Sequence, residues 1–104
     1  MINVIIKRHK NEYELSMNGH ADYSRNGNDI VCASASTIAY TLWGFLENCP
    51  EVIDMDTIER EGELEISCTA DKTICRTAFY MTAIGLLQLE KAYPQNVSVK
   101  VTGF

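Results

Sequence analysis

The segment Glu12–Asn18, EYELSMN, alternates between polar and apolar side chains. Its apolar members fall on one side of an extended chain: Tyr13, Leu15 and Met17. A period of two predicts a strand with one buried face and one solvated face. Residues 2–7 show a similar alternation, and Asn11 supplies a turn between the two segments. Together they predict an antiparallel hairpin.

Two helices are predicted from their start and stop signals. Asp29 is a good N-cap for a helix that runs to about residue 48 and is stopped by Pro50. Asp71 is the corresponding cap for a second helix, which ends before Pro94. The segment between Gly19 and the first helix has no periodicity and predicts a loop.

The remaining segments complete the fold. Residues 52–59 and 63–69 predict a second hairpin joined around Glu61-Gly62, and alternating valines at 97–101 predict a short last strand. The order is ββαββαβ, and its grouped hairpins indicate an α+β two-layer sandwich in which two helices pack on one largely antiparallel sheet. Residues 1–104 are expected to form a single domain.

Charge and composition exclude several functional classes. Fourteen acidic residues face nine basic ones, a net charge of -5, and the one dense basic cluster is Lys7–Lys10. Direct nucleic-acid binding is therefore not expected, and a basic partner is favoured. The apolar stretches fall short of the roughly 20 residues of a membrane span, and the N-terminus lacks signal-peptide features. We expect a cytoplasmic protein without membrane contact.

Both predicted helices are apolar over more than one stripe. A helix in a two-layer monomer should carry a polar outer face. The excess predicts that the helices pack against a second subunit in a homodimer. The alternative is cover by loops and by the neighbouring helix.

The cysteines and histidines argue against a metal site. None of the four cysteines (Cys32, Cys49, Cys68 and Cys75) forms a C-x-x-C pair, and neither histidine has zinc-like spacing. We expect free thiols and no metal or other cofactor.

His20 and Cys32 form the candidate catalytic pair. Cys32 lies three residues past Asp29, in the first turn of a helix, where free amides and the helix dipole favour a thiolate. A nearby histidine could take its proton and later give it to a leaving amine, while the helix amides could stabilise an oxyanion. Cys75 has a similar helical position, but its one candidate histidine is His9, which lies in a charged hairpin. The plain alternative is a buried cysteine and a surface histidine.

The same residues carry a resemblance to a known family. Gly19-His20-Ala21, the run Gly27-Asn28-Asp29-Ile30-Val31-Cys32-Ala33, and Ser36 resemble the signature of the ribosomal-processing cysteine protease family, Prp. The chain length and predicted element order also agree. The resemblance implies that Cys32 is the nucleophile and His20 the general base and acid.

The resemblance also implies a substrate and a partner. The family removes a short N-terminal extension from bacterial large-subunit ribosomal protein twenty-seven, and its members form homodimers. Cleavage follows a run of hydrophobic and aromatic residues and precedes a small residue. The expected partners are thus the precursor of that ribosomal protein and a second copy of the chain.

Five further residues are candidates for supporting or substrate-binding roles. Gly19 allows a sharp turn or close approach to substrate. Asp29 either orients His20 or caps the helix, and we favour the cap. Ser36, one turn after Cys32, either positions the site or bonds back to the Cys32 carbonyl. Tyr23 and Arg25 form either a lid over bound peptide or part of a solvated loop.

Two other functions fit the same residues. One is a non-enzymatic ribosome-assembly factor that binds the same basic partner, and the other is a thiol redox sensor that uses Cys32. A Cys32→Ser variant distinguishes the three functions. A protease would lose cleavage and keep binding, and an assembly factor would lose nothing. A redox sensor would lose only its oxidant response.

Overall fold

The elements follow the predicted order. The structure, a computed structural model, describes residues 1–23, 29–71 and 73–104. Its elements are β1 (Ile2–His9), β2 (Glu12–Asn18), α1 (Ile30–Glu47), β3 (Val52–Arg60), β4 (Glu63–Ala70), α2 (Thr73–Ala92) and β5 (Val97–Thr102). Both hairpins, both helices and the last strand are therefore where the sequence predicts them.

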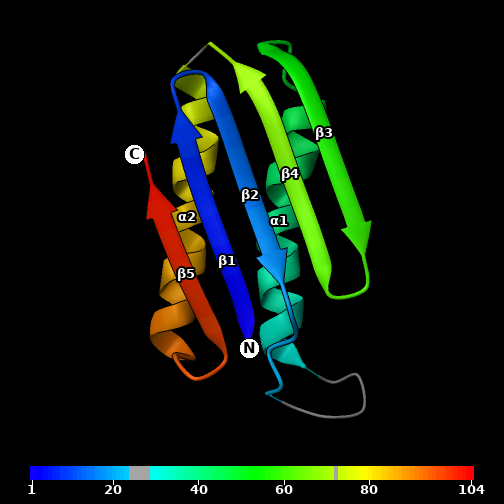
Figure 1. Cartoon of the computed structure of the whole chain (residues 1–104), viewed down its shortest axis with the longest axis vertical. Coiled ribbons are helices and arrows are strands. Elements are labelled where there is room, and N and C mark those ends of the chain that lie inside the picture. The colour runs from blue at the N-terminus through cyan, green and yellow to red at the C-terminus, as the bar shows by residue number, and fades with distance from the viewer. Residues whose placement is uncertain (24–28, 72) are drawn as a thin grey trace.

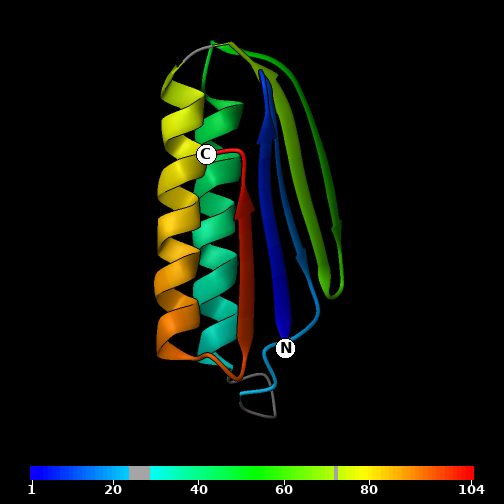
Figure 2. The same cartoon turned by 60° about the vertical axis from the view of Figure 1, so that its left-hand side comes forward.

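The strands form one five-stranded sheet in the order β3-β4-β2-β1-β5, visible from right to left in Figure 1. Three neighbouring pairs are antiparallel, and the pair β1–β5 is parallel. Both helices lie on the same face of the sheet, as Figure 2 shows, and the other face is open to solvent. The predicted two-layer α+β sandwich with a largely antiparallel sheet is confirmed.

Strand alternation decides which side chains enter the core. In β1, β2 and β4 every second residue points to the helices and is buried, as the period of two predicts. The largest fully buried side chains come from strands and helices alike: Phe79, Ile6, Leu15, Leu46, Ile66, Leu86, Val4 and Val31. Strand β3 is different, because it lies at the sheet edge and contributes no buried residue.

Helix α1 begins and ends at the predicted signals. Asp29 is its N-cap and Asn48 its C-cap, and Pro50 follows two residues later. By length and composition α1 is apolar enough to cross a membrane, but it packs with α2 under the sheet and buries Leu42 and Leu46 in the core. The cap predicted at Asp71 stays a prediction, because residue 72 lies outside the described residues.

The outer face of the helices is unusually apolar, as their sequences predict. The exposed large side chains of α2 are Ile74, Tyr80, Met81, Ile84 and Leu87, and those of α1 include Ile30, Tyr40 and Phe45. A hollow of about 290 Å³ lies between the two helices, lined by Phe45, Ile74, Met81 and neighbours. The neighbouring helix covers only part of the apolar surface, because Ile38 and Ala78 pack against the core while the side chains named above stay exposed.

Candidate active site

Gly19 turns the chain out of β2 at the edge of the candidate site. Its φ is +98°, and a Cβ built there would lie 2.3 Å from the Met1 carbonyl oxygen. Its N–H donates to the Gly62 carbonyl across 2.9 Å, which ties the segment to the β3–β4 turn. Any side chain at this position would collide with the backbone and strain the left-handed conformation, so glycine is required.

Asp29 caps α1 and fixes its first turn. Its Oδ1 accepts from the backbone N–H of Val31 at 3.0 Å and of Cys32 at 2.9 Å, and its carbonyl accepts from Ala33 N–H. Its Oδ2 accepts from Tyr23 N–H at 3.1 Å, so one carboxylate joins the loop to the helix. The cap predicted from the sequence is confirmed.

The cap leaves fewer free amides at the start of α1 than expected. The helix amides that were expected to stabilise an oxyanion include those of Val31 and Cys32, and both are already bonded to Asp29. A hydrogen-bond donor aimed at a developing charge must be free to meet it. The candidate donor at the sulfur is instead a backbone amide from outside the helix.

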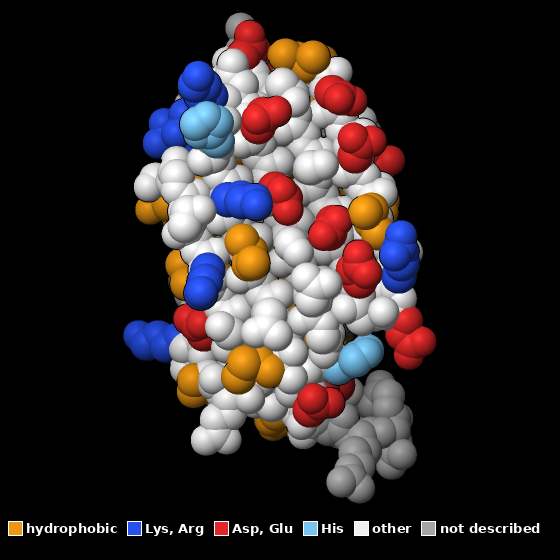
Figure 3. All heavy atoms as spheres, viewed as in Figure 1, with side chains coloured by type: hydrophobic (Ala, Val, Ile, Leu, Met, Phe, Trp, Pro, Cys, Tyr) orange, Lys and Arg blue, Asp and Glu red, His pale blue; other side chains and the backbone are white. Residues whose placement is uncertain are grey.

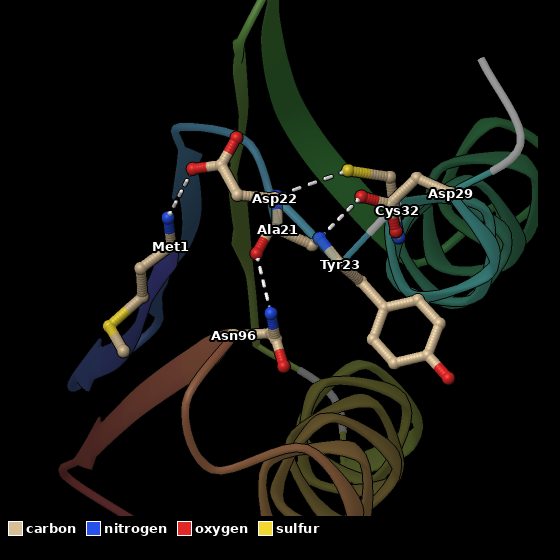
Figure 4. A network of polar contacts seen from close by, with 7 residues as sticks. All are labelled: Met1, Ala21, Asp22, Tyr23, Asp29, Cys32 and Asn96. Atoms are coloured by element: carbon tan, nitrogen blue, oxygen red, sulfur yellow. Dashed lines mark hydrogen bonds and ion pairs between the residues drawn. The ribbon is translucent and has the colours of Figure 1, made fainter. Parts of the chain in front are cut away.

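That donor is the N–H of Ala21, which lies 3.2 Å from Cys32 Sγ. Ala21 is almost fully buried, and its carbonyl accepts from Asn96 Nδ2 at 2.8 Å. The N-terminal ammonium of Met1 pairs with Asp22 at 3.2 Å beside it. Figure 4 shows this network, in which Met1 and Asn96, the residues just before β1 and β5, hold the segment whose Ala21 amide meets the sulfur. An amide that donates to sulfur stabilises negative charge there.

His20 lies beside this amide and against the β3–β4 turn. A Cβ built on Gly62 would lie 3.1 Å from His20 Nε2, so the imidazole packs directly on that glycine. His20 and Cys32 line the same cleft, of about 230 Å³. Both residues are described, and no direct hydrogen bond joins them in this structure. Catalytic hydrogen bonds are often long before substrate binds.

The walls of the cleft come from α1 on one side and the second hairpin on the other. Ser36 and Tyr40 follow Cys32 at intervals of four, so the three side chains share one stripe of α1. Opposite them lie Glu59 and Arg60. The remaining lining residues are Ile2, Met17, Gly19, Gly62, Glu63 and Leu64.

The other predicted residues differ in whether they line the cleft. Ser36 lies in the cleft, but its hydroxyl does not bond back to the helix, although those of Ser34 and Thr37 do. The Tyr23 ring packs edge-on against Tyr93, with centroids 5.2 Å apart, and does not line the cleft. Arg25 lies outside the described residues. The lid role of the loop therefore stays a prediction.

Sequence reasoning missed three residues that shape the site: Tyr40, Glu59 and Gly62. The spacing of four from Cys32 through Ser36 was the available signal for Tyr40. Gly62 was recognised as part of a turn, but its contact with His20 depends on how two distant segments pack. Ala21 belongs to the Gly19-His20-Ala21 motif, but the role of its backbone amide could not be predicted, because a backbone group gives no side-chain signal.

The other three cysteines lie together in the core, and the described part of the chain holds no disulfide. Cys49 Sγ is 3.7 Å from Cys75 Sγ. Burial raises the pKa of Cys68 to about 11 and, together with its contact with Cys49, that of Cys75 to about 12. The thiols of Cys68 and Cys75 are therefore held neutral. Among the described residues no group of three or more potential ligands is arranged to hold a metal ion.

Comparisons with known proteins point to one family. The family model of the cysteine protease Prp matches residues 1–98. The ribosomal processing cysteine protease Prp of Mycoplasma pneumoniae is 30% identical over 98 residues, which are 94% of this chain and 92% of that protein.

Solved structures have the same fold. The essential ribosomal processing protease Prp from S. aureus, in complex with a covalently linked product peptide, has a TM-score of 0.84 and 23% identity, covering 97% of this chain and 99% of that chain. SMU.848 from Streptococcus mutans has a TM-score of 0.74 and 24% identity, covering 99% and 96%. Fold and sequence agree, and the chain belongs to the ribosomal processing cysteine protease family, Prp.

Proposed function

We propose that this protein removes the N-terminal extension of large-subunit ribosomal protein twenty-seven, with Cys32 as nucleophile and His20 as general base and acid. The observation that carries the proposal is the placement of the Cys32 sulfur: it shares a cleft with His20 and accepts a hydrogen bond from Ala21 N–H. The other three thiols are buried. The similarity to the Mycoplasma pneumoniae protein and to the peptide-bound S. aureus protein supports the substrate class.

The first half of the reaction transfers the peptide to sulfur. His20 takes the proton from Cys32 Sγ, and the thiolate attacks the scissile carbonyl carbon. Negative charge then moves from sulfur to the carbonyl oxygen. The Ala21 amide, already directed at the sulfur, is the nearest identified donor for that oxygen. As the C–N bond breaks, His20 gives its proton to the leaving amine.

The second half restores the enzyme. His20 takes a proton from water, and the resulting oxygen nucleophile attacks the thioester carbon. The C–S bond breaks, and the N-terminal extension is released with the new carboxyl group at its end. Cys32 then recovers its proton through His20. Asp29 holds the first turn that carries Cys32 and also holds the loop through Tyr23 N–H. Asp29 therefore contributes to catalysis by positioning Cys32 and the loop.

We further propose that the protein is a cytoplasmic homodimer. Ribosomal proteins are made and assembled in the cytoplasm, so the protease meets its substrate there.

The apolar outer face of the helices, with Ile74, Met81 and Ile84 exposed, is the surface that a second copy would cover. Sedimentation should show a dimer, and Met81→Glu should shift it to the monomer. A wild-type monomer at micromolar concentration would contradict the proposal.

The decisive experiment mixes the purified protein with the ribosomal precursor and measures the product mass. Wild type should release the extension, and Cys32→Ala should bind the precursor without cutting it. A precursor that binds and stays intact with wild type would favour the assembly-factor alternative. Loss of an oxidant response in Cys32→Ser without any peptide cleavage would favour the redox sensor.

A further inference from the structure

At the far end of the cleft a hydrogen bond joins its two walls. Tyr40, two turns of α1 after Cys32, donates its hydroxyl to Glu59 Oε2 on β3. The hydrogen bond to Glu59 raises the pKa of Tyr40, so the phenol stays neutral and remains a donor. Both side chains are exposed to solvent. A bound peptide running along the stripe from Cys32 to Tyr40 therefore reaches this pair.

Among the described residues that line the cleft, Arg60 is the one with a fixed positive charge, and it pairs with Glu63 at 4.0 Å. Among the described residues Glu59 takes part in no ion pair; its partner is the neutral Tyr40 hydroxyl. A carboxylate bonded to a phenol keeps lone pairs that can accept from an ammonium or guanidinium group.

The opposite face of the same sheet is also acidic, although Glu59 itself points toward the helices, as its register partner Leu64 does. The solvent face of the sheet carries many acidic side chains over the β2, β4 and β3 side, as Figure 3 shows. By strand alternation and register they are Glu12, Glu14, Asp54, Asp56, Glu63 and Glu65. This field attracts basic chains. Ribosomal proteins are rich in lysine and arginine because they neutralise RNA phosphates.

We propose that Glu59 and Tyr40 form a subsite for a lysine or arginine side chain of the substrate. The proposal rests on the proposed function of the cleft. The cationic side chain bonds to Glu59, and Tyr40 turns its hydroxyl away or shares the carboxylate. The pair thus selects peptides by charge a few residues from the bond that Cys32 attacks.

The spacing of the helix fixes where this residue lies in the peptide. Eight residues of helix rise about 12 Å, and an extended peptide advances about 3.3 Å per residue. Helical side chains lean toward the N-terminus, and the longer Tyr40 side chain extends further that way than Cys32, which shortens the distance. The lysine or arginine of the substrate therefore lies about two to four positions from the scissile bond, in the half of the peptide that lies over Tyr40.

The test uses binding, so that it does not depend on cleavage. Fluorescent peptides based on the precursor cut region carry lysine, glutamine or glutamate at each position up to four residues on either side of the bond. Their affinity for Cys32→Ala is compared with that for Cys32→Ala/Glu59→Gln. We expect lysine to bind about three- to tenfold tighter than glutamine at one position, and the gain to vanish with Glu59→Gln and to shrink in high salt.

Two further variants complete the design. Glu65→Gln, added to Cys32→Ala, removes the same charge from the outer face of β4 and should keep the preference for lysine. Tyr40→Phe should keep the preference and tighten lysine binding slightly, because it removes a competitor for Glu59. A lysine preference at no position, or one that survives Glu59→Gln, would overturn the subsite. Charge-selective binding by a wild-type protein that does not cut would refute the proposed function and leave the subsite standing.

Discussion

Cys32 and Cys75 occupy corresponding places in the two halves of the chain. Each follows a β-hairpin and lies in the first turn of a helix. Cys32 is partly exposed, lies in a cleft with His20 and accepts a hydrogen bond from an outside amide. Cys75 is fully buried against Cys49, and its pKa is raised to about 12.

The difference teaches that a helix N-terminus alone does not make a reactive thiol. The dipole is available in both helices, but burial at Cys75 outweighs it, because removing a thiolate from water costs more than the dipole returns. At Cys32 the packing leaves one side open and supplies a donor from the loop. The partners brought by tertiary structure decide which cysteine can act.

The largest expected effect comes from removing each sulfur in turn. Cys32→Ala should lower cleavage of the precursor by about 10⁴ or more, as expected for loss of a nucleophile. Cys75→Ala should retain cleavage and lose about 1–2 kcal/mol of stability through a small cavity. Product mass and urea unfolding measure the two effects. Equal loss of cleavage in both variants would break the comparison.

His20→Ala should lower turnover by about 10² to 10⁴, the span for removal of a general acid and base. His9→Ala is the matched control, because His9 ends β1 and does not line the cleft. Circular dichroism should show both variants folded. Undiminished cleavage by folded His20→Ala would exclude it as the base.

Native alkylation should label Cys32 first. At pH 8 a thiol with a pKa of about 11 or 12 is ionised to less than about one part in a thousand. Burial slows these thiols further, so Cys32 should react about a hundredfold faster than Cys68 or Cys75. Peptide mass spectrometry gives the order of labelling. If Cys75 reacted before Cys32, the assignment of the nucleophile would be wrong.

Gly62→Ala should reduce turnover about tenfold with the fold retained. The added Cβ would lie 3.1 Å from His20 Nε2, and the φ of +70° strains any other residue. The imidazole must shift, and small shifts of a catalytic group are costly. Gly44→Ala is the control, since its Cβ meets nothing within 4 Å; it should keep activity and add about 1 kcal/mol to helix stability. Identical kinetics of both variants would argue against a positioned His20.

Asn96→Ala should have the smallest effect. It removes the bond that holds the Ala21 carbonyl, so the Ala21 amide should lie less firmly on the Cys32 sulfur. We expect alkylation of Cys32 to slow about threefold while that of Cys75 is unchanged. Gln95→Ala, at an exposed neighbour, should change neither rate. A uniform change at all four cysteines would show general loosening instead of a local role.

Much of the candidate site was predictable from the sequence, and the features that were not predicted were missed for one common reason. His20 and Cys32 were identified from residue type, helix position and the family signature, and the cap at Asp29 from its place before an apolar helix. The expectation that the first-turn amides stabilise an oxyanion did not take into account that the Asp29 side chain already bonds two of them. Residue patterns show which groups are near a helix start, but not which of them are already bonded.

The sequence by itself determined the elements and their faces. Alternation in β1, β2 and β4, and the caps and stops of α1, are local properties that neighbouring residues set. Only the tertiary structure decided that the Ala21 amide meets Cys32, that Gly62 supports His20, and that Tyr40 meets Glu59. These contacts join residues 11 to 42 positions apart, so they depend on how the layers pack and on no pattern that a short stretch of sequence contains.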